Sequence, residues 1–441
     1  MSSDNDVRAA TPAQDDAQRK EQSQAQRKRY TSSQIARIRN GARVYPLTRA
    51  GLSIKRTLSM RVTQQQRAVD RRKERTRMAI CVVLLVVLAF ISLCPMGAAG
   101  QYYAYTVSYT TFTPLEVFNF IYLHVYQFIA QTSHMFDMHT DGWLIENASG
   151  YWAFERRSGV VGITLICAVL LSVSGMLFQN VFKNPIAGPS MLGVSSGVSI
   201  GVVILVAVYG ASATVMIRER YLLCYGLGVA ILLLVLAIGR FLSRKGGSLN
   251  IMAMLLVGML LSQMLGFVIS FVTLFVMETD DYLLFYNVSQ QLVVDTSPIS
   301  WICLGIAAVV SLVPIYLMRF KLNGLALGDI EARTMGLSLP ALRIIAMVCG
   351  SIMILAAQIH TGMVGLVSLI VPFLSRSLFG CEFSKQLAGN VCLSGIFLLL
   401  CRDLCDIIPF VGDGVALGSL VGFVALPVFL VLMARQSRGW E

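Results

Sequence analysis

The sequence predicts an all-α polytopic membrane protein with about ten transmembrane helices, and three observations lead to this fold class. First, 56% of the 441 residues are hydrophobic and only 14% are charged, whereas a soluble domain usually carries about 25% charged residues. Second, apolar runs of roughly 18 or more residues recur along the chain, and each is long enough to cross a bilayer as a helix. Third, these runs are too long for barrel strands, and lipid offers no partners to unpaired backbone groups.

The N-terminal segment, residues 1–77, is predicted to be a basic, disordered cytoplasmic extension. Residues 1–78 contain 19 Lys and Arg against 7 Asp and Glu, a net charge of +12, whereas residues 79–441 contain 17 of each. The segment has little apolar periodicity, which is typical of chains that cannot bury enough surface to fold alone. We expect the basic cluster at residues 71–77 either to end the first helix or to bind anionic membrane lipid. Because the excess charge is confined to this segment, we predict no nucleic-acid partner.

The transmembrane domain is predicted to cover residues 78–435, with residues 436–441 as a cytoplasmic C-terminal end. An even number of spans places both termini on one side. With the N-terminus inside, the short inward loops and the C-terminal end carry 12 Lys and Arg and the outward loops carry four, so the positive-inside rule predicts cytoplasmic termini. The predicted spans are 78–98, 159–181, 190–209, 221–241, 250–276, 299–318, 341–358, 362–379, 388–407 and 415–434.

The longest outward segment, about residues 99–158, is rich in Tyr, Phe and Trp. Such side chains favour the membrane–water interface, and the segment is short for a core of its own. We therefore expect an extracellular cap rather than a separate domain.

The cysteines and histidines do not form a recognisable metal or cofactor site. The ten cysteines show no paired C-x-x-C spacing and lie mostly in or beside apolar runs, which is typical of small buried hydrophobic residues. The histidines lie at outward positions without ligand spacing, so a contact with haem or iron is the weaker alternative. We predict no metal site and no cofactor. The four histidines are His124, His134, His139 and His360.

Glycine and proline patterns indicate close helix packing and broken helices. The spacing Gly193-x-x-x-Gly197-x-x-x-Gly201 places three glycines on one helix face, where a neighbouring helix can approach closely, and Gly418-x-x-x-Gly422 repeats it. Kinks at prolines expose backbone groups, which is tolerated inside protein or beside a watery cavity. The prolines at such places are Pro185, Pro189, Pro372 and Pro427.

The inward segment after the sixth span is the most informative stretch. It contains two acids and an arginine and ends at Gly336, a residue type common at helix C-caps. The pattern predicts a short amphipathic surface helix that offers charges to a partner, and a plain connector is the alternative. Its sequence is Leu322-Asn323-Gly324-Leu325-Ala326-Leu327-Gly328-Asp329-Ile330-Glu331-Ala332-Arg333-Thr334-Met335-Gly336-Leu337.

That stretch resembles the coupling segment of the FecCD-type permeases, a family that imports iron–siderophores, haem and cobalamin, whose pattern is L-A-L-G-[DE]-x-x-A-x-x-L-G. Three further blocks occur in the family's order. Ser174–Gly197 resembles S-G-x-x-x-Q-x-x-x-x-N-P-L-A-x-P-x-x-L-G-V-S-x-G, and Gly362–Pro372 resembles G-x-I-G-F-V-G-L-I-V-P. The last two helices keep Asp403 and Pro427. The resemblance covers about residues 79–435.

The resemblance implies the type II ABC importer permease fold in a bacterial inner (cytoplasmic) membrane. The chain would pair with a second permease subunit, either a copy of itself or a paralogue, with the translocation path at their interface. Cytoplasmic ATP-binding subunits would dock on the coupling segment, about residues 323–343, and an extracytoplasmic substrate-binding protein would deliver the cargo. A ferric siderophore is the expected cargo, with haem and cobalamin as alternatives.

The resemblance also implies roles for individual residues. The ATPase-coupling residues would be Gly328, Asp329, Glu331, Ala332, Arg333 and Gly336. The binding protein would dock at Arg156 and Arg157, for which an interface anchor is the alternative. The fifth span, residues 250–276, would line the path. Residues of the path or of the packing around it would be Gln179, Asn184, Pro185, Gly193, Gly197, Gly258, Pro372, Asp403 and Pro427.

The chain departs from the family pattern at Phe373, where a histidine is common, and at Ala416, where a proline is usual. One arginine, Arg157, remains where the family often has R-L-P-R. These departures concern cargo and docking. Asp403 is an acid in an otherwise apolar helix, and we expect a local pair with Arg402 or a structural hydrogen bond, with a role in cargo passage as the alternative.

The chain contains no G-x-x-x-x-G-K-[ST] phosphate loop. The sequence therefore predicts a transport subunit that is not an enzyme and takes its energy from a partner ATPase. An ion-coupled secondary transporter is the alternative from another class. It would require acids in several spans or inverted repeats with broken helices, and only the cluster around Asp403 offers such acids.

Overall fold

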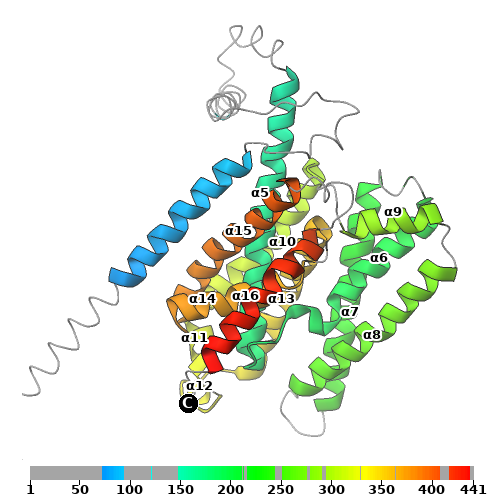
Figure 1. The fold of residues 1–441 in the computed structure, drawn as a ribbon. Coiled ribbons are helices and arrows are strands. Elements are labelled where there is room, and N and C mark those ends of the chain that lie inside the picture. Colours follow the sequence, from blue (N-terminus) through cyan, green and yellow to red (C-terminus); the bar gives the residue numbers. More distant parts are fainter. Residues whose placement is uncertain are drawn as a thin grey trace, which may run out of the picture. The chain divides into compact units, whose positions relative to one another are not determined.

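The computed structural model of the chain (Figure 1) describes residues 72–93, 121, 148–210, 212, 216–243, 251–275, 279–290, 295–327, 329–362, 364–407 and 417–437. The predictions for residues 1–71 of the N-terminal extension, for most of the aromatic outward segment, for Gly328 and for the last residues of the chain lie outside this set, whereas residues 72–77 of the extension are helical. The chain divides into two units between Lys73 and Glu74, and all the helices from residue 148 onwards belong to the second unit.

Every regular element in the described ranges is a helix. A helix at Arg72–Leu93 comes first, and η2 is the one short 3-10 element in the series after it. In chain order the series is α5 (Ala148–Phe182), η2 (Pro189–Leu192), α6 (Val194–Tyr209), α7 (Ile217–Ser243), α8 (Ile251–Phe275), α9 (Thr279–Gln290), α10 (Pro298–Leu317), α11 (Arg319–Leu327), α12 (Asp329–Thr334), α13 (Leu339–Thr361), α14 (Val367–Phe379), α15 (Phe383–Ile407) and α16 (Leu417–Ser437).

The apolar helices correspond, in order, to the ten predicted spans. Seven are long and apolar enough to cross a membrane, and three are shorter. The all-α polytopic fold is therefore confirmed. The seven are Arg72–Leu93, Phe154–Phe182, Ile217–Phe241, Ala253–Phe275, Pro298–Leu317, Leu339–Thr361 and Phe383–Cys405, and the shorter ones are Val194–Tyr209, Val367–Phe379 and Leu417–Val431.

Several boundaries differ from the sequence prediction, and three of the differences have a local cause. α5 begins at Ala148 rather than near residue 159, because the helix continues through polar residues that hydropathy excludes. The third span begins as η2, since Gly193 has a left-handed φ of 77° and turns the chain into α6. α14 begins at Val367, later than predicted, because Gly362 has a φ of 74° and ends α13.

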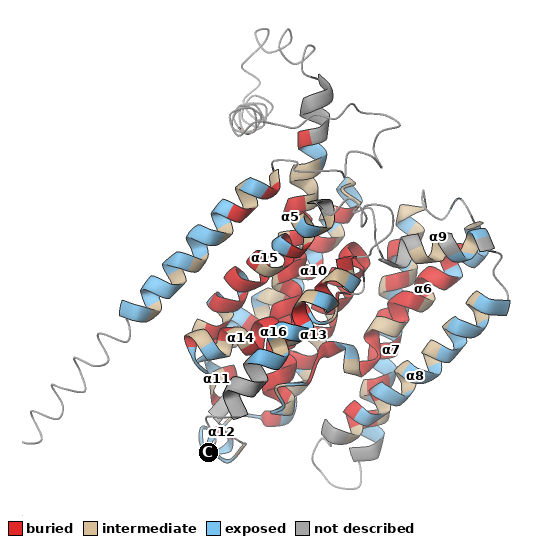
Figure 2. Cartoon of the chain, in the orientation of Figure 1, coloured by how far each residue is buried: buried red, intermediate tan, exposed pale blue. Residues whose placement is uncertain are grey.

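α5 is packed against α13, α14 and α15 and is the most buried of the long helices. In its most apolar stretch 72% of the residues are buried, against 11% for α8. Figure 2 shows the same contrast, with α5 largely buried and α8 largely exposed. Leu170, Leu171 and Phe178 of α5 are fully buried. A helix that is apolar on all sides belongs in the interior, and α5 lies there.

Small residues let α5 approach its neighbours closely. A Cβ atom at Gly175 would lie 1.5 Å from the carbonyl oxygen of Ser368 in α14, and one at Gly350 of α13 would lie 2.7 Å from the ring of Phe178. The Ser174 hydroxyl donates a hydrogen bond of 2.6 Å to the carbonyl oxygen of Gly350. Close backbone approach and hydrogen bonds between helices stabilise packing in membranes.

α8 packs against η2, α6 and α7, and most of its length faces outwards. Met264, Phe267 and Phe271 are among its exposed side chains. A continuous apolar surface of this kind is suited to contact with lipid or with another transmembrane subunit.

Candidate functional site

The segment predicted to couple to a partner forms α11 and α12 and ends at a capping glycine. Gly336 has a φ of 74°. Its N–H donates to the carbonyl oxygen of Arg333 at 2.9 Å, and the Leu337 N–H donates to that of Ala332 at 3.1 Å. These bonds satisfy carbonyl groups at the helix end. The prediction of a short surface helix closed by Gly336 is therefore confirmed.

α12 turns one face to the bundle and the other outwards. Ala332 is fully buried, whereas Ile330 is 76% exposed and Met335 is 57% exposed. Glu331 and Arg333 are exposed as well. The outward face therefore presents two large apolar side chains beside charges of both signs, a combination suited to contact with a partner protein.

Asp329, at the start of α12, has a side chain that is 41% exposed and that contacts two cations; its part in coupling stays a prediction. Lys183 Nζ donates to its Oδ1 at 2.6 Å, and Arg343 Nη2 donates to Oδ1 and Oδ2 at 2.7 and 2.8 Å. The hydrogen bond from Lys183, with a further one from Arg343, holds the pKa of Asp329 below its usual value. The network joins the end of α5, α12 and α13.

The connector, residues 183–188, leads from α5 to η2 by a tight path. Lys183 has a φ of 51°, a left-handed conformation that is uncommon for residues other than glycine. The Asn184 Oδ1 accepts a hydrogen bond of 3.0 Å from the Ile186 N–H, and Pro185 between them fixes its own φ. Asn184 and Pro185, predicted as path or packing residues, shape this turn.

Three predicted glycines lie where helix backbones meet. A Cβ atom at Gly193 would lie 3.1 Å from the carbonyl oxygen of Gly258, and one at Gly258 would lie 2.5 Å from that of Met191 in η2. A Cβ atom at Gly197 would lie 2.8 Å from the Cα of Gly228 in α7. Close packing accounts for all three positions, and a place on the translocation path stays a prediction.

α14 is held by side-chain amides from two neighbouring helices. Pro372 lacks an N–H, so α14 loses one internal hydrogen bond. Gln179 Nε2 of α5 donates to the carbonyl oxygen of Leu369 at 2.9 Å, and Gln386 Nε2 of α15 donates to that of Pro372 at 3.2 Å. Gln179 of α5 therefore contacts α14 close to Pro372, and Gln386 of α15 contacts Pro372 itself.

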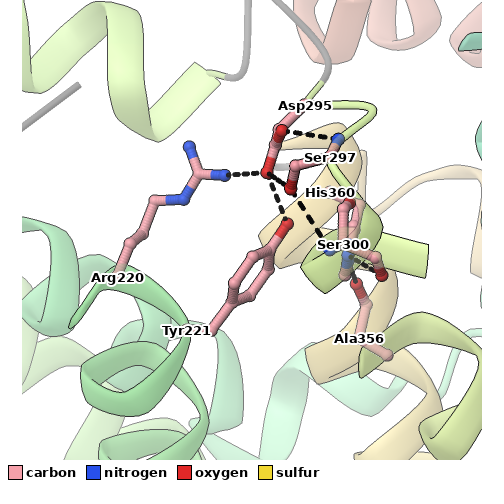
Figure 3. A network of polar contacts seen from close by, with 7 residues as sticks. All are labelled: Arg220, Tyr221, Asp295, Ser297, Ser300, Ala356 and His360. Atoms are coloured by element: carbon pink, nitrogen blue, oxygen red, sulfur yellow. Dashed lines mark hydrogen bonds and ion pairs between the residues drawn. The ribbon is translucent and has the colours of Figure 1, made fainter. Parts of the chain in front are cut away.

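A polar network lies at the end of α13 far from α12 and joins it to α7 and α10 (Figure 3). Arg220 Nη2 lies 3.3 Å from Asp295 Oδ2, and the Tyr221 hydroxyl donates to the same oxygen at 3.1 Å. The hydroxyl and N–H of Ser297 donate to Asp295 Oδ2 and Oδ1 at 3.0 and 2.9 Å. The Ser297 hydroxyl also caps α10 by accepting from the Ser300 N–H. The largely buried Asp295 carboxylate is thus bound by four donors.

His360 joins this network from the last turn of α13. It is 2% exposed, and its ring centroid lies 5.2 Å from that of Tyr221. Nδ1 lies 2.7 Å from the carbonyl oxygen of Ala356, and Nε2 lies 3.2 Å from that of Ser300. A neutral imidazole has one N–H and donates to one of these oxygens, whereas the charged ring donates to both. Nε2 therefore makes a contact between α13 and α10, and Nδ1 makes one within α13.

A second polar contact at this end involves Arg157 and Asp403. Arg157 Nε donates to the carbonyl oxygen of Ser92 at 2.6 Å, and its Nη2 lies 3.9 Å from Asp403 Oδ1. The Ser92 hydroxyl donates to Asp403 Oδ2 at 2.6 Å. The expected structural hydrogen bond of Asp403 is confirmed, but the ion-pair partner is Arg157 and not the adjacent Arg402. Docking of a binding protein at Arg157 and at the exposed Arg156 stays a prediction.

The predicted residues fall in separate places. Of the coupling residues that the structure describes, Asp329, Glu331, Ala332 and Arg333 lie on α12 and Gly336 follows it. The glycines lie at the contacts of η2, α6 and α8, and Pro427 is an exposed residue inside α16. Sequence reasoning missed Lys183, Arg343 and the network around Asp295. Lys183 could have been found as the charge that directly precedes the Asn184-Pro185 turn.

The described residues contain no group of three or more His, Cys, Asp or Glu side chains placed to hold a metal ion. What they do contain is ion pairs and amide–carbonyl bonds between helices. Ion pairs and hydrogen bonds of this kind can be exchanged for others when helices move.

Comparisons with known proteins agree with this arrangement. The profile of the FecCD transport family matches residues 115–435. A "Probable iron chelatin transport system permease protein" of Helicobacter pylori is 27% identical over 286 residues, which are 65% of this chain and 82% of the relative. The "Uncharacterized ABC transporter permease protein YvrB" of Bacillus subtilis is 27% identical over 63% of this chain and 77% of its own. The "Vitamin B12 import system permease protein BtuC" of Salmonella paratyphi A is 27% identical over 62% of this chain and 81% of its own.

A solved structure described as an inward-facing metal-chelate type ABC transporter covers 82% of this chain and 99% of its own, with a TM-score of 0.60 and 18% identity. At that identity the likeness concerns the fold, and it confirms the type II ABC importer permease fold. Permeases of this class work with ATPase subunits and substrate-binding proteins. Since the family profile covers more than half of the chain, the protein belongs to the FecCD transport family and is a multi-pass ABC importer permease.

Proposed function

We propose that the chain moves an iron chelate, of the ferric siderophore class, across the bacterial cell membrane, driven by ATPase subunits that dock on α12. The main support for this proposal is the outward face of α12. Ile330 and Met335 are large, apolar and exposed, and α12 lies outside the candidate spans. Exposed apolar anchors with charges around them are the usual core of a protein interface.

On this proposal the α12 end is cytoplasmic, together with both termini. The bias of Lys and Arg towards the inward loops supports this orientation. The apolar outward face of α8 supports contact with a second permease subunit, a copy of this chain or a paralogue, with the translocation path between them. Arg156 and Arg157 would meet the binding protein on the far side.

The iron chelate is chosen over other cargo because of two similarities. One relative is described as an iron chelatin permease and one solved structure as a metal-chelate type transporter. Cobalamin is the second candidate, since another relative of equal identity is described as a vitamin B12 permease, and haem is the third.

The docking proposal is tested by pulling down the tagged chain from native membranes solubilised in mild detergent. The wild-type chain should recover a nucleotide-binding subunit with ATPase activity. Arg333→Glu should lose it, because charge reversal next to Ile330 disrupts the interface. Lys321→Glu is the matched control, since it reverses an exposed cation on α11 at the same end. Equal recovery with Arg333→Glu and Lys321→Glu would refute docking on α12.

The cargo is tested with the assembled complex and its binding protein in proteoliposomes. ATP-dependent uptake of a radio-iron-labelled hydroxamate chelate is expected. Uptake of cyanocobalamin or haem in its place would reassign the cargo and leave the permease role intact. Flux that follows an ion gradient and ignores ATP would favour the ion-coupled secondary transporter.

A further inference from the structure

Asp329 sits between two cations that belong to different parts of the fold. Arg343 is anchored in α13, where its side chain is 11% exposed, and it donates to both carboxylate oxygens. Lys183 belongs to the connector after α5 and is 43% exposed. An exposed ion pair adds little stability. The pair matters here for geometry, because the contact of Lys183 Nζ with Asp329 Oδ1 joins α12 to the connector.

The connector is stiff between Lys183 and η2. The side chain of Asn184 bonds the backbone two residues on, and the Ala187 N–H donates to the carbonyl oxygen of Asn184 at 3.1 Å. Pro185 and Pro189 remove two further backbone rotations. A displacement of Lys183 is therefore passed to η2 with few torsions available to absorb it.

η2 in turn meets α8 through backbone atoms. A Cβ atom at Gly258 would lie 2.5 Å from the carbonyl oxygen of Met191 and 2.7 Å from the Cα of Leu192, and one at Gly193 would lie 3.1 Å from the carbonyl oxygen of Gly258. The three atoms nearest to a Cβ at Gly258 all belong to the backbone of η2, so no change of rotamer relieves that contact, and the Ser262 hydroxyl of α8 lies 3.0 Å from a Cβ at Gly193. A shift of η2 therefore acts directly on α8.

We propose that Lys183 and Asp329 are positioning residues that connect α12 to α8: movement of α12 pulls on Lys183, the connector passes it to η2, and η2 shifts α8. Arg343 orients the Asp329 carboxylate for this contact. The inference rests on the proposed function, in which ATPase subunits move α12. Contiguity alone does not establish energetic coupling between two sites, so the test must measure the coupling.

The test uses the full complex with its ATPase subunits and binding protein in proteoliposomes, and it measures uptake of the radio-iron hydroxamate chelate per ATP hydrolysed. Lys183→Met and Asp329→Asn should each lower this ratio about tenfold, within the usual range of coupling between sites. In Lys183→Met, which lies outside the docking helix, ATPase recovery and thermal stability should stay at the wild-type level. Lys183→Arg keeps the charge and should restore the ratio, and Lys321→Met is the control for loss of an exposed lysine.

The double variant decides whether the two residues act as one link. Lys183→Met with Asp329→Asn should be no worse than either single change, because interacting residues are not additive. An unchanged ratio in Lys183→Met, losses that multiply in the double variant, or loss of the ATPase subunits from Lys183→Met would each overturn the inference. The wild-type complex separates the further inference from the proposed function. If the wild-type complex shows no ATP-dependent uptake, the proposed function itself is contradicted.

Discussion

The contact between α5 and α14 gives the sharpest prediction about stability. Replacing Gly175 by alanine would place a Cβ atom 1.5 Å from the carbonyl oxygen of Ser368, and real Cβ atoms essentially never come within 3.0 Å of another heavy atom. The obstructing atom belongs to the backbone, so no rotamer change relieves the clash. The helices would have to separate locally by roughly 1.5 Å, and overpacking of this kind costs about 1–3 kcal/mol or more.

The net effect is smaller than the clash alone, because alanine favours a helix over glycine by about 1 kcal/mol. A net loss of about 2 kcal/mol in the free energy of unfolding should lower the melting temperature by roughly 5 °C. The assay is thermal unfolding of the purified chain in one detergent, followed by tryptophan fluorescence.

The control is the same substitution at a glycine with room around it. A Cβ atom at Gly226 of α7 would meet nothing within 4 Å, so Gly226→Ala should leave the melting temperature unchanged or raise it slightly. If Gly175→Ala melts together with Gly226→Ala, the backbone approach of α5 and α14 is not as the structure has it.

Three further outcomes are expected. Asp295→Asn leaves the mostly buried Arg220 without its counter-ion and should cost about 3–5 kcal/mol, while the double change with Arg220→Gln should recover part of that in the same melting assay; a double variant that is less stable than Asp295→Asn would contradict the pairing. Gln386→Leu removes the donor to the buried Pro372 carbonyl and should cost about 1–3 kcal/mol, whereas unchanged melting would show that the bond carries no weight. The pKa of Asp329 is lowered. Its ionised form therefore stabilises the fold above the usual aspartate pKa, and this stabilisation is lost only as pH falls through the lowered value. Uptake per ATP should not change between about pH 5 and pH 8, and a decline at the acid end would count against an ionised Asp329.

Hydropathy and length were sufficient to find the apolar helices, because a bilayer imposes one length and one composition on every span. The capping pattern was sufficient for α12, because Gly336 follows the last helical turn at the position where a left-handed residue is needed. The start of α5 was missed because a hydropathy criterion ends a span at the first polar residues, whereas the helix continues through them.

The partners of charged residues could not be predicted, because ion pairs between helices leave no trace in sequence spacing. Lys183 and Asp329 are 146 positions apart. Of the two contacts expected of Asp403, the structure shows the hydrogen bond; the cation beside it is Arg157 on another helix, which no spacing along one helix could indicate, since consecutive residues of a helix point to different faces. Family resemblance pointed to the right segments but did not say which side chains within them face each other.

The division of burial among the helices bears on which of them can move. α5 is buried along most of its length, and displacing it would disrupt contacts with three neighbouring helices at about 25 cal/mol for each Å² of apolar surface exposed. α8 has little of its surface buried within the chain, so a shift of α8 disturbs few internal contacts. On the proposed route the connector leaves the rigid helix at Lys183, whose left-handed backbone lies at a helix end, where hinge residues commonly absorb a change of direction. Movement of α12 can thus reach α8 while α5 stays in place.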